Sequence, residues 1–363
     1  MKKKVIIFGT GGMFEKVYHK IDFDKYEIVC FWDNNRKKKG LEYKGKIIKT
    51  PSKQYGEIDK IVVCSSFFEE IATQLITEYN VPECMIENYL YFTKCELLEY
   101  YNNINIDKIE LKEIINYIEN HPLEVFNYEF YKNYRMVTIE VMYDIENKMF
   151  YVDFMNNKMY FKRSLDTKEK VEKYYRFLLA EQDKKSPHCY FNFDLNITKD
   201  SIVVDAGVAE GNFALSIIDK VKKLILIEID EEWIEALKIT FAPWKEKVTI
   251  INKYLSDVSN ETSITLDDIN KTDYINLVKL DIEGYEIRAL AGAKNLLLKQ
   301  ESFQLISCCY HYQNEENELK ELLKLYFDKV EVSKGYMFFP YFNGTKYLNQ
   351  TARLRRGLIM VNR

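Results

Sequence analysis

The feature that most constrains the fold is an apolar run that leads directly into a glycine-containing loop. Residues 201–205 read as a buried strand, Gly207 and Gly211 follow within a few residues, and a helical segment begins after them. Glycine adopts backbone angles that other residues avoid and leaves room beside the main chain, so such a turn lets a ligand approach the backbone. A strand, a glycine turn and a helix in this order predict a parallel α/β sheet with a binding turn after its first strand.

An acidic residue ends the next predicted strand. Glu228 follows the glycine loop by about 20 residues, the spacing at which a carboxylate can accept hydrogen bonds from ribose hydroxyls. The loop itself reads Asp205-x-Gly-x-x-x-Gly, which differs from the dinucleotide fingerprint because an acid ends the strand. The pattern favours a nucleoside cofactor, and a purely structural turn is the alternative.

Strands alternate with helices in two separate parts of the chain. In the C-terminal part, strands are expected at 201–205, 223–229, 248–252, 274–280 and 304–309, with an antiparallel pair at 330–338 and 357–361. In the N-terminal part they are expected at 5–8, 27–32, 45–48 and 60–64. We therefore predict a smaller Rossmann-like α/β domain at 1–92, a mixed helix and hairpin linking region at 93–185, and a larger α/β domain at 186–363.

Three motifs in the C-terminal part, in this order and spacing, are more specific than any single glycine turn. They are Leu266-Asp-Asp268, Lys279-Leu-Asp281-Ile-Glu283-Gly and Leu290-Ala-Gly-Ala293. With them, about residues 186–330 resemble the FkbM family of methyltransferases. The resemblance implies a class I methyltransferase fold, with a Rossmann-like seven-stranded sheet that binds S-adenosylmethionine (SAM) and releases S-adenosylhomocysteine (SAH).

The same resemblance implies which residues hold the cofactor. Asp205, Gly207 and Gly211 would hold its methionine part. Glu228 would hold the ribose, and Asp257 would lie near the adenine. Members often have Glu-Pro at the end of the second strand; here Ile follows the acid, which is kept.

The candidate catalytic residues are Asp281, Glu283 and His311. The first two follow a predicted strand and His311 follows the next one, at the edge where open α/β sheets place their sites. Asp281 and Glu283 are candidates for substrate contact, and His311 is a candidate base for a hydroxyl acceptor. Each also has a structural interpretation, as a helix cap, a loop residue or a packed histidine. Asp281 and Glu283 could instead bind a divalent ion together; the sequence does not decide this, and no metal ligand is assigned.

The N-terminal domain carries a weaker nucleotide pattern. Gly9-Thr-Gly11-Gly12 follows its first strand and Asp33 ends its second, but Phe14 stands where a small residue is expected. The segment resembles the Rossmann-like N-terminal domain of bacterial sugar acyltransferases, which implies a nucleotide-sugar site or a docking module. A degenerate fold kept for packing or for homo-oligomer formation is the alternative.

Charge and cysteine content limit the classes of partner. The net charge of −4 leaves no basic excess for nucleic acid or an anionic membrane. No apolar stretch reaches the roughly 18 residues of a membrane span. Seven cysteines without a CxxC pair indicate a reduced, cytoplasmic protein without structural zinc.

The sequence leaves three functions to distinguish. The first is a SAM-dependent O-methyltransferase acting on a sugar hydroxyl in glycan or polysaccharide biosynthesis. The second is an NAD(P)- or nucleotide-sugar-dependent sugar-modifying enzyme that works from the N-terminal site. The third is a module that binds SAM without transferring its methyl group.

Overall fold

The computed structural model describes residues 1–299, 301–339 and 353–363, which form two compact units. The first unit comprises Met1–Tyr128 together with Arg353. The second comprises the described residues of Glu129–Gln350 and Leu354–Arg363. The boundaries expected from the sequence at residues 92 and 185 stay predictions.

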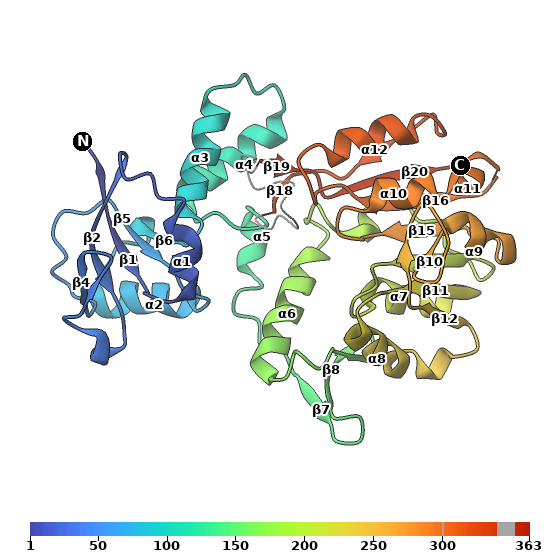
Figure 1. The fold of residues 1–363 in the computed structure, drawn as a ribbon, viewed down its shortest axis with the longest axis horizontal. Coiled ribbons are helices and arrows are strands. Elements are labelled where there is room, and N and C mark those ends of the chain that lie inside the picture. Colours follow the sequence, from blue (N-terminus) through green and yellow to red (C-terminus); the bar gives the residue numbers. More distant parts are fainter. Residues whose placement is uncertain (300, 340–352) are drawn as a thin grey trace. The chain divides into compact units, whose positions relative to one another are not determined.

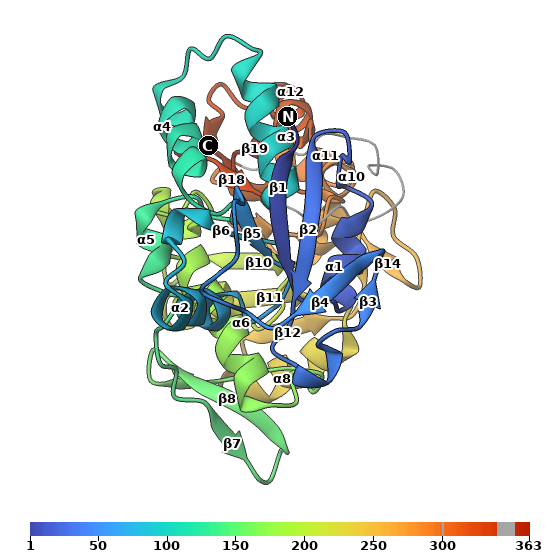
Figure 2. The ribbon, with the colours of Figure 1, turned by 90° about the vertical axis from the view of Figure 1, so that its left-hand side faces the viewer.

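A six-stranded sheet organises the first unit, and Figure 2 shows its central strands β1 and β2 side by side. Its order is β3-β4-β2-β1-β5-β6, and only β3 is antiparallel to its neighbour. Helices α1 and α3 contribute to the core on one face and α2 to the core on the other. The elements are β1 (Lys3–Phe8), α1 (Gly12–Tyr18), β2 (Tyr26–Trp32), β3 (Glu42–Tyr43), β4 (Lys46–Lys49), β5 (Lys60–Val63), α2 (Phe68–Tyr79), β6 (Ile86–Asn88), α3 (Tyr91–Asn102) and α4 (Ile109–Asn120).

Phe14 is a core residue of the first unit. Its ring is fully buried and makes edge contacts with Tyr18 and Phe31. A third ring, that of Tyr43, lies 5.9 Å away between centroids. The position where a dinucleotide fold has a small residue is therefore filled by an aromatic cluster that holds α1 on the sheet.

A seven-stranded sheet forms the centre of the second unit (Figure 1). Its order is β12-β11-β10-β15-β16-β20-β17; the first five of these strands are parallel, and β20 is antiparallel to both of its neighbours. The predicted fold class is confirmed, including the closing antiparallel pair. The strands are β10 (Ile202–Ala206), β11 (Lys223–Ile227), β12 (Val248–Ile251), β15 (Leu277–Leu280), β16 (Gln304–Cys308), β17 (Glu331–Val332) and β20 (Leu358–Asn362).

Both faces of this sheet are covered. Val203 and Val204 point to opposite faces of β10, and neither is exposed. Such doubly buried strands explain the continuous apolar runs in the sequence. The helices that follow the strands are α7 (Asn212–Ile217), α8 (Glu231–Thr240), α9 (Leu266–Thr272), α10 (Glu286–Ala291), α11 (Lys294–Lys299) and α12 (Glu315–Leu323).

A helix and hairpin region precedes the sheet within the second unit. Its three strands are antiparallel, and the backbone N–H of Tyr160 donates to Thr240 Oγ1 on α8 at 3.1 Å. None of the helices in the described part of the chain has both the length and the apolar character needed to cross a bilayer. The remaining elements are α5 (Glu129–Lys132), β7 (Met142–Asp144), β8 (Met149–Phe154), β9 (Asn157–Tyr160), α6 (Lys168–Glu181), and the strand pairs β13 (Tyr254–Leu255) with β14 (Ser263–Ile264) and β18 (Met337–Phe338) with β19 (Leu354–Arg355).

Candidate functional site

The parallel register brings the predicted site residues to one edge of the sheet. Ala206 on β10 pairs with Ile227 on β11 and with Leu280 on β15, and Leu280 pairs with Ser307 on β16. The four strands therefore end together. The loops that follow them carry the glycine turn, Glu228, Asp281 and His311.

Packing within the protein requires glycine at both loop positions. Gly207 has a φ of +69°, and a Cβ there would lie 1.7 Å from the carbonyl oxygen of Asp281. Gly211 has a φ of +86°, and a Cβ there would approach Leu237 and Phe241 to 2.9 Å. The sequence predicts glycine here for the approach of a ligand, whereas close packing and a left-handed backbone already require glycine at both positions.

Glu228 is held against the loop by backbone N–H groups. Its Oε2 accepts from Ala209 at 3.0 Å, and its Oε1 accepts from Ile229 at 2.7 Å and Asp230 at 2.9 Å. The side chain is nearly buried. A carboxylate has about four acceptor positions. Among the described residues Oε2 accepts from Ala209 alone, so it can still accept a bond from a ligand hydroxyl.

Asp205 and Lys279 form a buried ion pair beneath the loop. Lys279 Nζ lies 3.1 Å from Asp205 Oδ1 and donates to the carbonyl oxygen of Gly207 at 2.7 Å. Burial opposes the charged form of Lys279, but the carboxylates of Asp205 and Asp281 raise the pKa of this lysine above its usual value. Lys279 is therefore a permanent positive charge that ties β15 to the loop after β10.

His311 lies between three carboxylates. Its Nε2 is 3.3 Å from Asp281 Oδ1, and its Nδ1 is 3.3 Å from Glu286 Oε1 and 3.6 Å from Glu315 Oε2. Burial alone would lower the pKa of His311, but Glu286 and Asp281 raise it well above its usual value. Although burial acts in the opposite direction, His311 and Lys279 lower the pKa of Asp281 well below its usual range. The pair is thus an imidazolium beside a carboxylate.

The other two predicted residues of the site are exposed. Glu283 lies in the loop between β15 and α10 with a φ of +58°, a left-handed conformation that is uncommon for a residue with a side chain. Asp257 accepts a hydrogen bond from Arg288 Nε at 2.8 Å and another from Ser256 Oγ at 3.0 Å. A ligand that used Asp257 would share it with Arg288.

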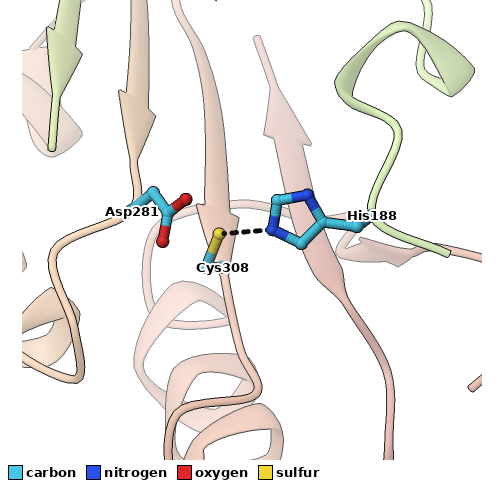
Figure 3. Close-up of side chains that lie close together, drawn as sticks. All are labelled: His188, Asp281 and Cys308. Carbon is cyan, nitrogen blue, oxygen red and sulfur yellow. Dashed lines mark hydrogen bonds between the residues drawn. The ribbon is translucent and has the colours of Figure 1, made fainter. Parts of the chain in front are cut away.

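The sequence had not singled out several residues that contact the site. The hydroxyl of Tyr190 donates to Asp281 Oδ2 at 3.0 Å. The thiol of Cys308 lies 3.5 Å from Nε2 of His188, and Figure 3 shows both side chains beside Asp281. Glu286 belongs to the segment Asp281-x-Glu-x-x-Glu. Its spacing of three residues from Glu283 is the sequence pattern that could have identified it as a site residue.

The glycine turn of the first unit is already engaged by protein groups. Asp33 Oδ2 accepts from Lys38 Nζ at 2.7 Å and from Thr10 Oγ1 at 2.9 Å. Its Oδ1 accepts from the backbone N–H of Asn35. A dinucleotide ribose would have to compete with the lysine for this carboxylate, which does not favour NAD(P) binding there.

Comparison with solved structures gives similar folds at low identity. The chain is 13% identical to the methyltransferase FkbM from Methylobacillus flagellatus KT, with coverage of 99% of this chain and 90% of that one and a TM-score of 0.46. Two other similar structures each align with 46% of this chain. They are the C-terminal domain of precorrin-6Y C5,15-methyltransferase from Rhodobacter capsulatus (10% identity, 82% of that chain, TM-score 0.31) and TrmK from M. capricolum in complex with SAH (14% identity, 64% of that chain, TM-score 0.29).

Comparison with family models gives a match for two separate segments of the chain. No curated protein matches the chain. Residues 1–87 match the model described as C2185-like, N-terminal, and the predicted resemblance of this segment to sugar acyltransferases stays a prediction. Residues 206–336, which contain most of the site but not Asp205 or His188, match the model described as the methyltransferase FkbM domain, so the resemblance inferred from the motifs is confirmed for this part of the chain.

Proposed function

We propose that the second unit is a SAM-dependent methyltransferase that methylates a sugar hydroxyl. The observation that carries the proposal is Glu228, held by three backbone N–H groups beside the glycine loop with acceptor capacity left on Oε2. This is the position from which a carboxylate binds ribose in a Rossmann-like sheet. Bound SAM would supply a methyl group activated by its sulfonium.

The other residues of the site have separate roles in binding the cofactor and the acceptor. Asp205, Gly207 and Gly211 form the loop for the methionine part, and Asp257 lies on the adenine side. Asp281 contacts the acceptor, because it is the partly exposed carboxylate of the buried cluster. His311 positions Asp281, since both of its ring nitrogens face carboxylates and neither is turned to an acceptor.

The geometric alignment of the reacting atoms contributes most of the rate acceleration in such a reaction. Methyl transfer is an in-line displacement, so holding acceptor oxygen, methyl and sulfur in line supplies much of the acceleration. A rigid, ion-paired Asp281 suits that task. The sugar acceptor is supported by the FkbM resemblance, and the role in glycan biosynthesis is part of the same proposal.

Calorimetric titration of the full chain with SAH tests the cofactor. Wild type should bind SAH, and Glu228→Ala should weaken binding about 10–100-fold, the value of one or two charge-assisted hydrogen bonds. Glu231→Ala, which removes an exposed carboxylate on α8, is the matched control and should bind like wild type. No SAH binding, with NADH or a nucleotide-sugar bound instead, would favour the sugar-modifying alternative in the first unit.

Transfer of the methyl group is tested separately, with radiolabelled SAM and a panel of free and nucleotide-linked sugars. Asp281→Asn should lower kcat while SAH affinity stays near that of wild type. SAH binding without transfer to any hydroxyl acceptor would support the binding-module alternative.

A further inference from the structure

Three donor side chains of different chemistry meet at the ends of β15 and β16. Asp281 directly follows β15, Cys308 ends β16, and His188 comes from the segment before β10. Figure 3 shows the imidazole and the carboxylate on either side of the sulfur, both directed towards it. One ligand atom from each side chain lies within 4.8 Å of the other two.

We propose that His188, Asp281 and Cys308 bind a divalent transition-metal ion, with Zn²⁺ the best match to the donors. The set is one imidazole nitrogen, one thiolate sulfur and one carboxylate oxygen, all of which Zn²⁺ accepts. Mg²⁺ and Ca²⁺ prefer oxygen alone, so the thiol argues against them. Three protein ligands leave the fourth position of a tetrahedron open.

The distances agree with this geometry. With bonds of about 2.0 Å to nitrogen and 2.3 Å to sulfur, a tetrahedral ion holds those two atoms about 3.5 Å apart. Nε2 of His188 and Sγ of Cys308 are 3.5 Å apart. Asp281 is partly exposed, and one of its oxygens lies within 4.8 Å of both other donor atoms. Binding would therefore need only a small movement of the carboxylate from its contacts with His311 and Tyr190.

Nε2 is the ring nitrogen of His188 that faces the other two donors, since it lies 3.5 Å from Sγ of Cys308. A metal-bound histidine donates its other N–H to an acceptor, usually a carboxylate or carbonyl. Nδ1 of His188 lies 3.4 Å from Nε2 of Gln182 and 3.8 Å from Oε1 of Glu181, at the end of α6. Ligation through Nε2 would therefore require the Gln182 amide to turn or the Glu181 carboxylate to move closer.

Charge balance allows the ion despite a nearby lysine. Lys279 is paired with Asp205, so its charge is already compensated. A thiolate at Cys308 and the carboxylate of Asp281 would together neutralise the two charges of the ion, while Glu286 compensates the imidazolium of His311. The second cluster, of Asp281, Glu286 and His311, is explained by ion pairing because both ring nitrogens of His311 face carboxylates.

Binding of the metal stands independently of the proposed function. Its role rests on that function: an ion with an open position can bind an acceptor hydroxyl and lower the pKa of that hydroxyl. An acceptor oxygen bound beside Asp281 would lie at the edge of the sheet where the cofactor is proposed to bind.

Cobalt substitution tests the site in the full chain. The protein is dialysed against chelator and titrated with Co²⁺ alone. Wild type should bind one equivalent, with a near-ultraviolet thiolate-to-cobalt band and the intense visible bands of tetrahedral cobalt. Cys308→Ser should lose the near-ultraviolet band. Cys309→Ser removes the adjacent, equally buried thiol and should keep it.

A second variant covers the case in which Cys308→Ser fails to fold. Asp281→Asn keeps the thiol and the imidazole, and it should weaken Co²⁺ binding at least roughly 10-fold while the thiolate band remains. The proposal is overturned if wild type gives no thiolate band, if Cys308→Ser keeps the band, or if Asp281→Asn binds Co²⁺ as tightly as wild type. SAH binding without a cobalt band would contradict only the proposed metal site. A cobalt band without SAH binding would contradict only the proposed methyltransferase function.

Discussion

At the scale of single residues, Lys279 holds the site together. Its ammonium group contacts Asp205 and the carbonyl oxygen of Gly207, and its side chain is nearly inaccessible to solvent. A buried ion pair gives little net stability, but removing one partner leaves the other charge buried without compensation. The lysine is therefore expected to be essential to the fold of this edge as well as to its chemistry.

Replacement of Lys279 by methionine should destabilise the protein by about 3–5 kcal/mol, because Asp205 loses its partner. The double variant Asp205→Asn/Lys279→Met should cost less than the sum of the two single changes. Urea unfolding of the four proteins measures this coupling. Lys238→Met, at an exposed position of α8, is the control and should change stability little. Additive losses would show that the two side chains do not depend on each other.

The residue-scale network was only partly predictable. Sequence reasoning selected Asp281 and His311 because they follow strands, and the structure places them 3.3 Å apart. It did not select Glu315, although Glu315 lies only four residues after its partner His311. It could not place His188 in the site, because its partners Asp281 and Cys308 are far away in the sequence. Such contacts depend on the register between strands and on the path of the loops, which the local pattern does not contain.

At the scale of elements, the family motifs have structural explanations. Both carboxylate oxygens of Asp267 accept from the first turn of α11, from the backbone N–H groups of Asn295 and Leu296. Gly292 ends α10, and a Cβ there would lie 2.2 Å from the carbonyl oxygen of Ser256. The Leu-Asp-Asp and Leu-x-Gly-Ala motifs thus join three helices to the segment after β13.

Gly292→Ala should destabilise the second unit by about 1–3 kcal/mol, the usual cost of overpacking. The cause is steric, because the φ of this glycine is −88° and suits any residue. Chemical denaturation measures the loss. Gly12→Ala, where a Cβ meets nothing within 4 Å, serves as control and should be neutral or slightly stabilising. Equal effects at both positions would contradict the explanation by close approach.

The start of α9 should give a pH-dependent contribution to stability. Hydrogen bonds from Lys271 and then Ser259 lower the pKa of Asp268 to about 2. A carboxylate whose pKa is lower in the folded state stabilises the fold above its unfolded pKa of about 3.9 and loses that effect as the pH falls through the folded value. Asp268→Asn should therefore destabilise the protein by a constant amount from pH 7 to about 5, and by progressively less from about 4 to 2. Denaturation midpoints at each pH check this, and a difference that disappears already at pH 5 would contradict it.

Long apolar strands were predictable and short polar ones were not. All five parallel strands of the second unit were expected, because runs buried on both faces leave a continuous apolar signal. Strand β6 was missed since it is three residues long and two of them, Glu87 and Asn88, are polar and buried. Glu87 is accommodated by a 2.7 Å ion pair with Lys94 on α3, a tertiary contact that no periodicity reveals.

At the scale of the whole molecule, the chain joins two α/β units that match different family models. Each unit has its own sheet and its own buried core. Units of this kind can unfold in separate steps, and a ligand stabilises only the unit that binds it. The location of the cofactor site can therefore be read from the unfolding of the intact chain.

Differential scanning calorimetry with and without SAH should show this asymmetry. SAH at about 100 times its Kd adds roughly 2.7 kcal/mol to the stability of the unit that binds it. For a unit of this size the gain raises Tm by several degrees, so one transition should move and the other should stay. Because Glu228 is the proposed ribose ligand, Glu228→Ala at the same SAH concentration should reduce this stabilisation to about 0.4–1.4 kcal/mol while leaving two transitions. A shift of both transitions, or a single transition that moves as one, would contradict this expectation and mean that the two units unfold as one cooperative system.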